Sequence, residues 1–124
     1  MAGRVPPRAL GPEELEDALA GRGLGEWRFV AEEAAGAPSS AAPDEPVVGE
    51  LVRDLRFPSF AAAIAFLAEL APACDAADHH PTWTNTYDRV EVRLVTHEAG
   101  GRVTERDVDL AAVMEARFRD LHGS

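Results

Sequence analysis

The residues best suited to chemistry lie between Asp75 and His97, in the stretch DAADHHPTWTNTYDRVEVRLVTH, which holds three of the chain's four histidines. His79 and His80 are adjacent and are followed by Pro81, and His97 ends the next apolar run. Near neutral pH a neutral imidazole accepts a proton and an imidazolium donates one. Three such groups gathered in one stretch predict proton-transfer chemistry.

A long helix should lead into the paired histidines. Apolar residues recur at helical spacing from Phe60 to Ala71, after a suitable N-cap at Ser59. Pro72 lacks an amide donor and clashes with the preceding turn. The helix is therefore predicted either to end near Ala71 or to continue with a kink toward Ala77.

The rest of the chain predicts four strands and two more helices. Alternation of apolar and polar residues favours strands over 27–31, 48–57, 83–87 and 90–97. A first helix should begin at Pro12, and a last helix should begin at Thr104, with Asp107 completing a capping box. The order αββαββα predicts an α+β two-layer sandwich. Its four-stranded antiparallel sheet should carry about three helices on one face.

We expect one domain, over residues 12–121. Residues 1–11 carry prolines and a glycine without periodicity, which indicates a flexible N-terminal arm. The run 32–46 contains three prolines and no large apolar residue, and it predicts a loop insertion between the first two strands.

Composition excludes several classes of protein. The formal net charge of −10 would repel phosphate backbones and anionic lipids, so we predict neither direct nucleic-acid binding nor a membrane partner. The single Cys74 suits a reducing compartment, and neither an export signal nor an apolar run of membrane-spanning length is evident. We therefore expect a cytoplasmic protein. Zinc would need three or four converging ligands, whereas adjacent histidines tend to diverge, so no metal site is predicted.

The spacing of these residues resembles the signature of the pterin-4a-carbinolamine dehydratases. The resemblance includes a DHHP-x-W stretch over 78–83 and a T-H-E turn over 96–98. The matching positions are Asp75, His79, His80, Pro81, Tyr87, His97 and Asp107.

The resemblance implies a dehydratase that removes water from a 4a-hydroxytetrahydropterin to give quinonoid dihydropterin, without metal or other cofactor. His79, His80 and His97 would line the pterin pocket, with His80 favoured as the acid and either of the other two as its partner. Trp83 can stack on a pterin or pack in the core, and for Asp107 helix capping is the better reading. The substrate-binding positions implied are Asp75, Asp78, Pro81, Trp83, Thr96 and Glu98.

A second hypothesis is a non-catalytic assembly or dimerisation factor on the same fold. By analogy with the family we also expect a homodimer or homotetramer and a functional link to an aromatic amino-acid hydroxylase. Two departures from the family pattern stand out, namely the 32–46 insertion and Pro72. A kink at Pro72 would move His79.

Overall fold

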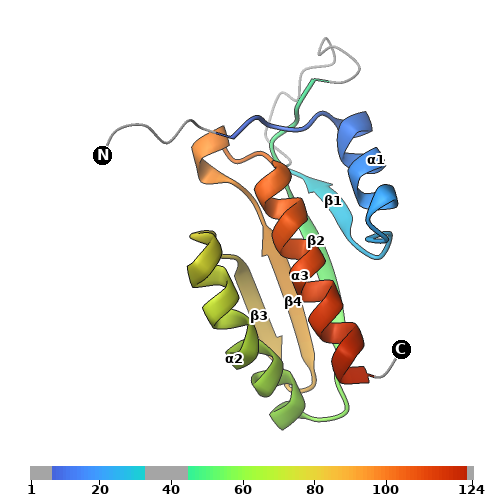
Figure 1. Cartoon of the computed structure of the whole chain (residues 1–124), viewed down its shortest axis with the longest axis vertical. Coiled ribbons are helices and arrows are strands. Elements are labelled where there is room, and N and C mark those ends of the chain that lie inside the picture. The colour runs from blue at the N-terminus through green and yellow to red at the C-terminus, as the bar shows by residue number, and fades with distance from the viewer. Residues whose placement is uncertain (1–6, 33–44, 123–124) are drawn as a thin grey trace.

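The computed structural model describes residues 7–32 and 45–122 (Figure 1). Among these residues it contains three α-helices, four strands and a short 3₁₀ helix. In chain order they are α1 (Pro12–Gly21), β1 (Arg28–Ala31), β2 (Gly49–Arg56), α2 (Phe60–Ala77), β3 (Thr82–Thr86), β4 (Arg89–Leu94), η1 (His97–Ala99) and α3 (Glu105–His122).

The four strands form one antiparallel sheet in the order β1-β2-β4-β3. Alternate residues such as Leu55, Val90 and Val92 point into a core that also receives the inner faces of the helices. Figure 1 shows α2 and α3 side by side across the sheet and α1 beside β1. The predicted two-layer α+β sandwich is therefore confirmed.

Helix α2 runs without interruption through Pro72 to Ala77, so of the two predicted alternatives the continued helix is correct. The Ser59 hydroxyl caps it by accepting the Ala62 N–H at 3.1 Å. Pro72 lies on the exposed side of the helix, where water can bond the carbonyl that the missing N–H leaves free. Its inner side is apolar and buried, at Ala63, Phe66, Leu67, Leu70 and Cys74.

By length and composition alone, α2 could also cross a membrane, since its mean hydropathy is 1.5 over Phe60–Ala77. The prediction that no run approaches such a span is too strong for this helix. Only 28% of its residues are buried, yet those residues form one continuous side that packs into the core. We therefore interpret α2 as a core helix of a two-layer domain with an apolar outer side.

The predicted arm and insertion fall partly on residues that the structure describes. Leu10 is 7% exposed, and its N–H donates to Val103 at 2.9 Å, so a flexible arm reaching residue 11 is wrong at its last residues. Residues 1–6 lie outside the described residues. So does most of the predicted insertion, since the description stops at Glu32 and resumes at Glu45. The Glu32 N–H still donates to Val48 at 2.9 Å, which extends the β1–β2 ladder.

Candidate functional site

The turn after α2 separates the two adjacent histidines. Asp78 takes the left-handed conformation, with φ 51° and ψ 44°, as the C-cap of α2. Asp tolerates this conformation better than most residues because its short polar side chain can bond locally. The Asp78 N–H bonds to the Asp75 carbonyl at 3.1 Å, and the His79 N–H bonds to the Cys74 carbonyl at 3.1 Å. The chain then points His79 inward and His80 outward.

His79 is held by a buried carboxylate. Its side chain is only 8% exposed, and its Nε2 lies 2.5 Å from Oδ1 of Asp107, which is fully buried. Asp107 lies in the first turn of α3, whereas His79 follows α2. The contact therefore ties together two helices that flank the core.

The Asp107 carboxylate also accepts two further hydrogen bonds. Its Oδ2 receives the backbone N–H of Thr104 at 2.9 Å and the hydroxyl of Thr96 at 2.8 Å. The first is the predicted capping contact. The capping interpretation of Asp107 was thus right but incomplete, because the same side chain holds His79. Sequence spacing showed that Asp107 turns back toward the helix start, but nothing in it placed His79 there.

His80 lies in a different environment, at the surface. Its Nε2 is 2.8 Å from Oδ1 of Asp75, and the two side chains are 59% and 79% exposed. Asp75 lies in the last turn of α2, so helix geometry brings it under the histidine. Each of the two histidines therefore has its own carboxylate, one buried and one exposed.

The sequence pattern predicted a strand that reaches His97, but His97 does not lie on a strand. Strand β4 ends at Leu94, and His97 begins η1. The reason is that Thr96 pairs with Arg102 in an isolated bridge, so the chain must turn through Gly100 and Gly101, both with φ above 70°.

The exposed His97 instead borders a groove of about 390 Å³ at the end of β1, β2 and β4, together with Val95. Arg93, in the same groove, is bound by Glu91 at 2.9 Å and Glu50 at 2.8 Å, and these hydrogen bonds raise the pKa of its guanidinium. Within the described residues, His97 makes no hydrogen bond to His79 or His80. In this described part of the chain, its link to the buried network is its chain neighbour Thr96.

The other predicted site residues are scattered around this turn. Trp83 packs against the hydrophobic core, which favours the packing reading over stacking on a ligand. Glu98 forms an exposed ion pair with Arg106 at 2.6 Å. Pro81 is half-buried, and the hydroxyl of Thr96 points to Asp107 rather than to a cavity.

The donor set around the turn is one of imidazoles, carboxylates and hydroxyls. In the part of the chain that the structure describes, no three His, Cys, Asp or Glu residues come close enough to share a metal ion. The arrangement can hold one histidine in a fixed orientation and present a second, exposed histidine beside it. Both are suited to moving protons.

Comparison with known proteins gives a consistent result. The family model described as pterin 4 alpha carbinolamine dehydratase matches residues 8–117. A crystal structure from Brucella melitensis, described as a transcriptional coactivator/pterin dehydratase, is 32% identical with a TM-score of 0.67, over 89% of this chain and 98% of that one.

Relatives that are similar in sequence carry the name of the same family. A protein of Opitutus terrae is 51% identical over 65 residues, which is 52% of this chain and 67% of the relative. A protein of Rhodopseudomonas palustris is 50% identical over 66 residues, 53% of this chain and 64% of the relative. Both carry the name "putative pterin-4-alpha-carbinolamine dehydratase". The similarity thus spans about two thirds of each relative's length.

Proposed function

Because the chain belongs to the pterin-4α-carbinolamine dehydratases, a family of hydro-lyases, we propose that it removes water from a 4a-hydroxytetrahydropterin to give quinonoid dihydropterin. The observation that carries the proposal is the pair of adjacent histidines, each bonded to a different carboxylate. Elimination needs a proton donor and a proton acceptor at nearby points, and such a pair can supply both.

The proposed reaction balances with these groups alone. The acid protonates the 4a-hydroxyl, the C4a–O bond breaks, and water leaves. The N5 lone pair forms the N5=C4a double bond, and the base accepts the proton lost from N5. His80 is proposed as the acid because it is exposed and because Asp75, 2.8 Å from its Nε2, holds the ring in one orientation. The base is then His79 or His97.

The substrate contacts are proposed from exposure. Asp75, Asp78 and Glu98 have exposed side chains around the turn, where a ligand can reach them. Pro81 and Trp83 are half-buried, so each can contact the pterin only with the exposed edge or face of its ring. Thr96 is fully buried and is proposed to act through Asp107 rather than by touching the pterin.

Stopped-flow absorbance of freshly generated 4a-hydroxytetrahydropterin tests this function. We expect the wild-type protein to accelerate its decay and His80→Ala to lose about 10²-fold or more of that rate. His122→Ala, a histidine outside the signature, is the matched control and should keep the rate. Circular dichroism must show that each variant is folded. A well-folded wild type that gives no acceleration refutes the dehydratase.

In that case the second candidate is a non-catalytic binding factor. It is favoured by one observation, the description of the Brucella melitensis structure as a transcriptional coactivator as well as a dehydratase. A binding factor has no chemical need for His80, so His80→Ala would leave its partner binding unchanged. The two candidates are thus separated by the same variant.

The proposed setting of the protein follows the family resemblance. We expect it in the cytoplasm, as a homodimer or homotetramer, in tetrahydropterin recycling beside an aromatic amino-acid hydroxylase. The apolar outer side of α2, with Phe60 50% and Ile64 41% exposed, supports self-association.

A further inference from the structure

The hydroxyl of Thr104 makes contacts that helix capping does not require. As the residue before α3, Thr104 accepts the Arg106 N–H on its Oγ1 at 3.2 Å, which is an ordinary capping contact. The same oxygen also lies 2.7 Å from Oγ1 of Thr96, on the far side of the η1 turn. Both threonines are fully buried. Thr104 is therefore joined to Asp107 twice, through its own N–H and through Thr96.

The direction of every hydrogen bond in this network follows from what each group can donate. A hydroxyl has one proton, and that of Thr96 points to Oδ2 of Asp107. Thr96 must then accept in its contact with Thr104, so Thr104 donates there. Thr104 in turn accepts from the Arg106 N–H, which can only donate. The chain thus runs one way, from the backbone of α3 to the carboxylate.

The Asp107 carboxylate at the end of this chain determines the proton on His79. Oδ2 of Asp107 already receives two donors, and Oδ1 faces Nε2 of His79. A carboxylate oxygen can only accept, so Nε2 must donate, and in the neutral ring Nδ1 then carries no proton.

Nδ1 of His79 is also reachable. No hydrogen bond to it is found among the described residues, where no side-chain nitrogen or oxygen is both sealed from solvent and without a partner. Nδ1 is therefore an acceptor that is not sealed from solvent, although the side chain as a whole is only 8% exposed. Such an atom suits the base of the elimination, the role that the site geometry alone left open between His79 and His97.

We propose that Thr104 is a positioning residue for the reaction. It orients Thr96, which with the Thr104 N–H fixes the Asp107 carboxylate, and Asp107 holds His79 with its proton on Nε2 and its Nδ1 free to accept the substrate proton. The inference rests on the proposed dehydratase function for its kinetic part only, because the position of the His79 proton can be measured without substrate.

Nuclear magnetic resonance of ¹⁵N-labelled wild-type protein tests the proton position directly. The ¹⁵N shifts and ring couplings of His79 should show a protonated Nε2 and an unprotonated Nδ1 at a pH where the ring is neutral. The opposite tautomer in the wild type overturns the proposal, and this outcome needs neither a variant nor activity.

Thr104→Val and Thr104→Ser then separate positioning from capping. Valine keeps the shape and the backbone N–H but removes the hydroxyl, so Thr96 and the Asp107 carboxylate are oriented less firmly. We expect shifted or broadened ¹⁵N signals from the His79 ring and a kcat about tenfold lower, with KM changed less than about twofold. Serine keeps the hydroxyl and should restore both. Thr84→Val, at an exposed strand position, is the matched control and should leave both unchanged.

The outcomes distinguish this proposal from the proposed function. A folded Thr104→Val protein with the wild-type His79 ¹⁵N signals and kcat shows that Thr104 only caps α3, and it sinks the inference. If Thr104→Val does not fold, the wild-type spectrum and Thr104→Ser decide. If the wild type has no dehydratase activity, the function fails, while the spectra still decide whether Thr104 and Asp107 set the proton on His79.

Discussion

At the scale of single residues, Asp78 makes two adjacent histidines different. Its left-handed backbone ends α2 and reverses the chain, so that His79 enters the buried network while His80 stays at the surface. In a continuing helix or a strand, neighbouring side chains would also point apart, but neither would lie against its own carboxylate. An acid and a base with separate partners can thus come from one dipeptide.

The role of Asp107 predicts what happens when its carboxylate is replaced by a side-chain amide. In Asp107→Asn the side-chain NH₂ cannot accept the His79 proton, so His79 should rotate or change tautomer. We expect the dehydration rate to fall by about 10²-fold or more, as measured by stopped-flow absorbance. Because Asp107 also caps α3, the assay must be run well below the variant's melting temperature.

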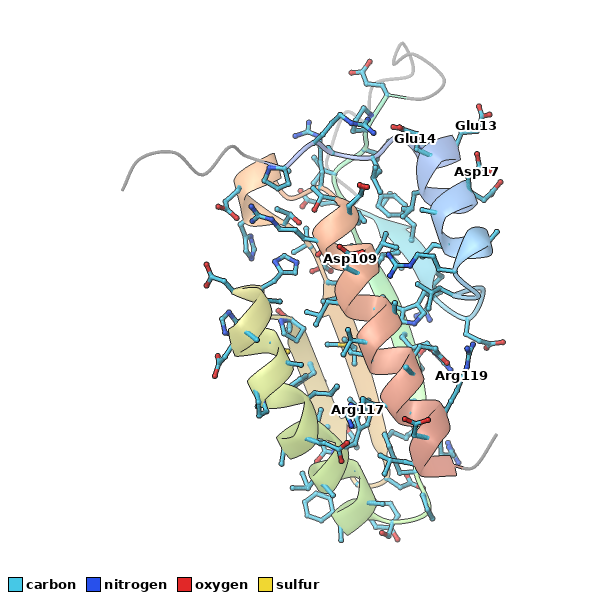
Figure 2. All side chains as sticks on the ribbon, in the orientation of Figure 1. Glu13, Glu14, Asp17, Asp109, Arg117 and Arg119 are labelled. Atoms are coloured by element: carbon cyan, nitrogen blue, oxygen red, sulfur yellow. The ribbon has the colours of Figure 1, made fainter. Side chains whose placement is uncertain are left out.

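Asp109→Asn is the matched control, two residues further along α3. Figure 2 labels Asp109 on this helix, and its side chain is 67% exposed and paired with Arg22 at 2.5 Å. Its loss should leave the rate unchanged, because its ion pair with Arg22 leads away from His79 and no other contact among the described residues joins the two. Equal losses in the two variants would show that Asp107 acts only by stabilising α3.

At the scale of elements, a buried ion pair joins α3 to the sheet beneath it. Glu115 of α3 is 3% exposed and accepts from Trp27 Nε1 at 2.9 Å. It also accepts from Arg53 of β2 at 3.0 and 3.1 Å. Both carboxylate oxygens of Glu115 and the three nitrogens that donate to them are thus satisfied, and the pair fixes how α3 lies across the strands. This matters for the site because the other end of α3 carries Asp107.

Removing one partner of this pair should be costly. In Glu115→Ala, Arg53 and the Trp27 N–H lose their acceptor, and we expect the free energy of unfolding to fall by about 3–5 kcal/mol in urea titrations. Glu69→Ala is the control, since Glu69 forms an exposed pair with Arg117 at 3.0 Å. That substitution should lower the free energy of unfolding by less than about 1 kcal/mol. Similar losses would mean that Glu115 contributes no more than a surface charge.

The same glutamate predicts a dependence of stability on pH. Burial raises the pKa of Glu115, but the hydrogen bonds and charge of Arg53 outweigh it, so the pKa lies below its ordinary value of 4.5. A carboxyl with a lowered folded pKa stabilises the fold above its unfolded pKa, and this contribution is lost as pH falls through the folded pKa. The stability difference between wild type and Glu115→Gln should therefore be largest at neutral pH and shrink below about pH 4.5.

Unfolding by urea at several pH values measures that difference directly. The other carboxyl groups titrate in both proteins, so their effect on the free energy of unfolding cancels in the difference between wild type and Glu115→Gln. A gap that stays constant down to strongly acid pH would contradict the assignment, because it would mean that the Glu115 charge contributes nothing.

At the scale of the whole molecule, the periodicity of apolar residues predicted the secondary-structure elements and their layers. Strand alternation and the helical stripe from Phe60 to Ala71 were sufficient for the element order and the two layers, because each element must bury one face. Periodicity could not place His97 on η1, since that turn depends on Thr96 pairing with Arg102 across the loop. It also could not bring Asp107 to His79, because only the packed fold puts α2 and α3 side by side.

Either a membrane or another protein could cover the apolar outer side of α2, and the properties of the whole molecule favour one of them. Phe60 and Ile64 expose apolar surface on a helix whose composition would also suit a bilayer, while the chain carries a net charge of −10. That charge disfavours anionic membranes, and one side of α2 is already committed to the core. We therefore predict that a second copy of the chain covers this side, because such an occupant leaves the fold intact.

Ile64→Glu tests that prediction. Size-exclusion chromatography with light scattering should give a dimer or tetramer for the wild type and a smaller species for the variant, because a charge at the centre of an apolar contact must be desolvated. Val113→Glu changes a residue of nearly equal exposure, 40% against 41% for Ile64, on α3 and should keep the wild-type mass. A monomeric wild type, or a variant of unchanged mass, would remove self-association through α2. Sedimentation of the wild type with neutral-lipid vesicles would then assign the apolar side of α2 to membranes.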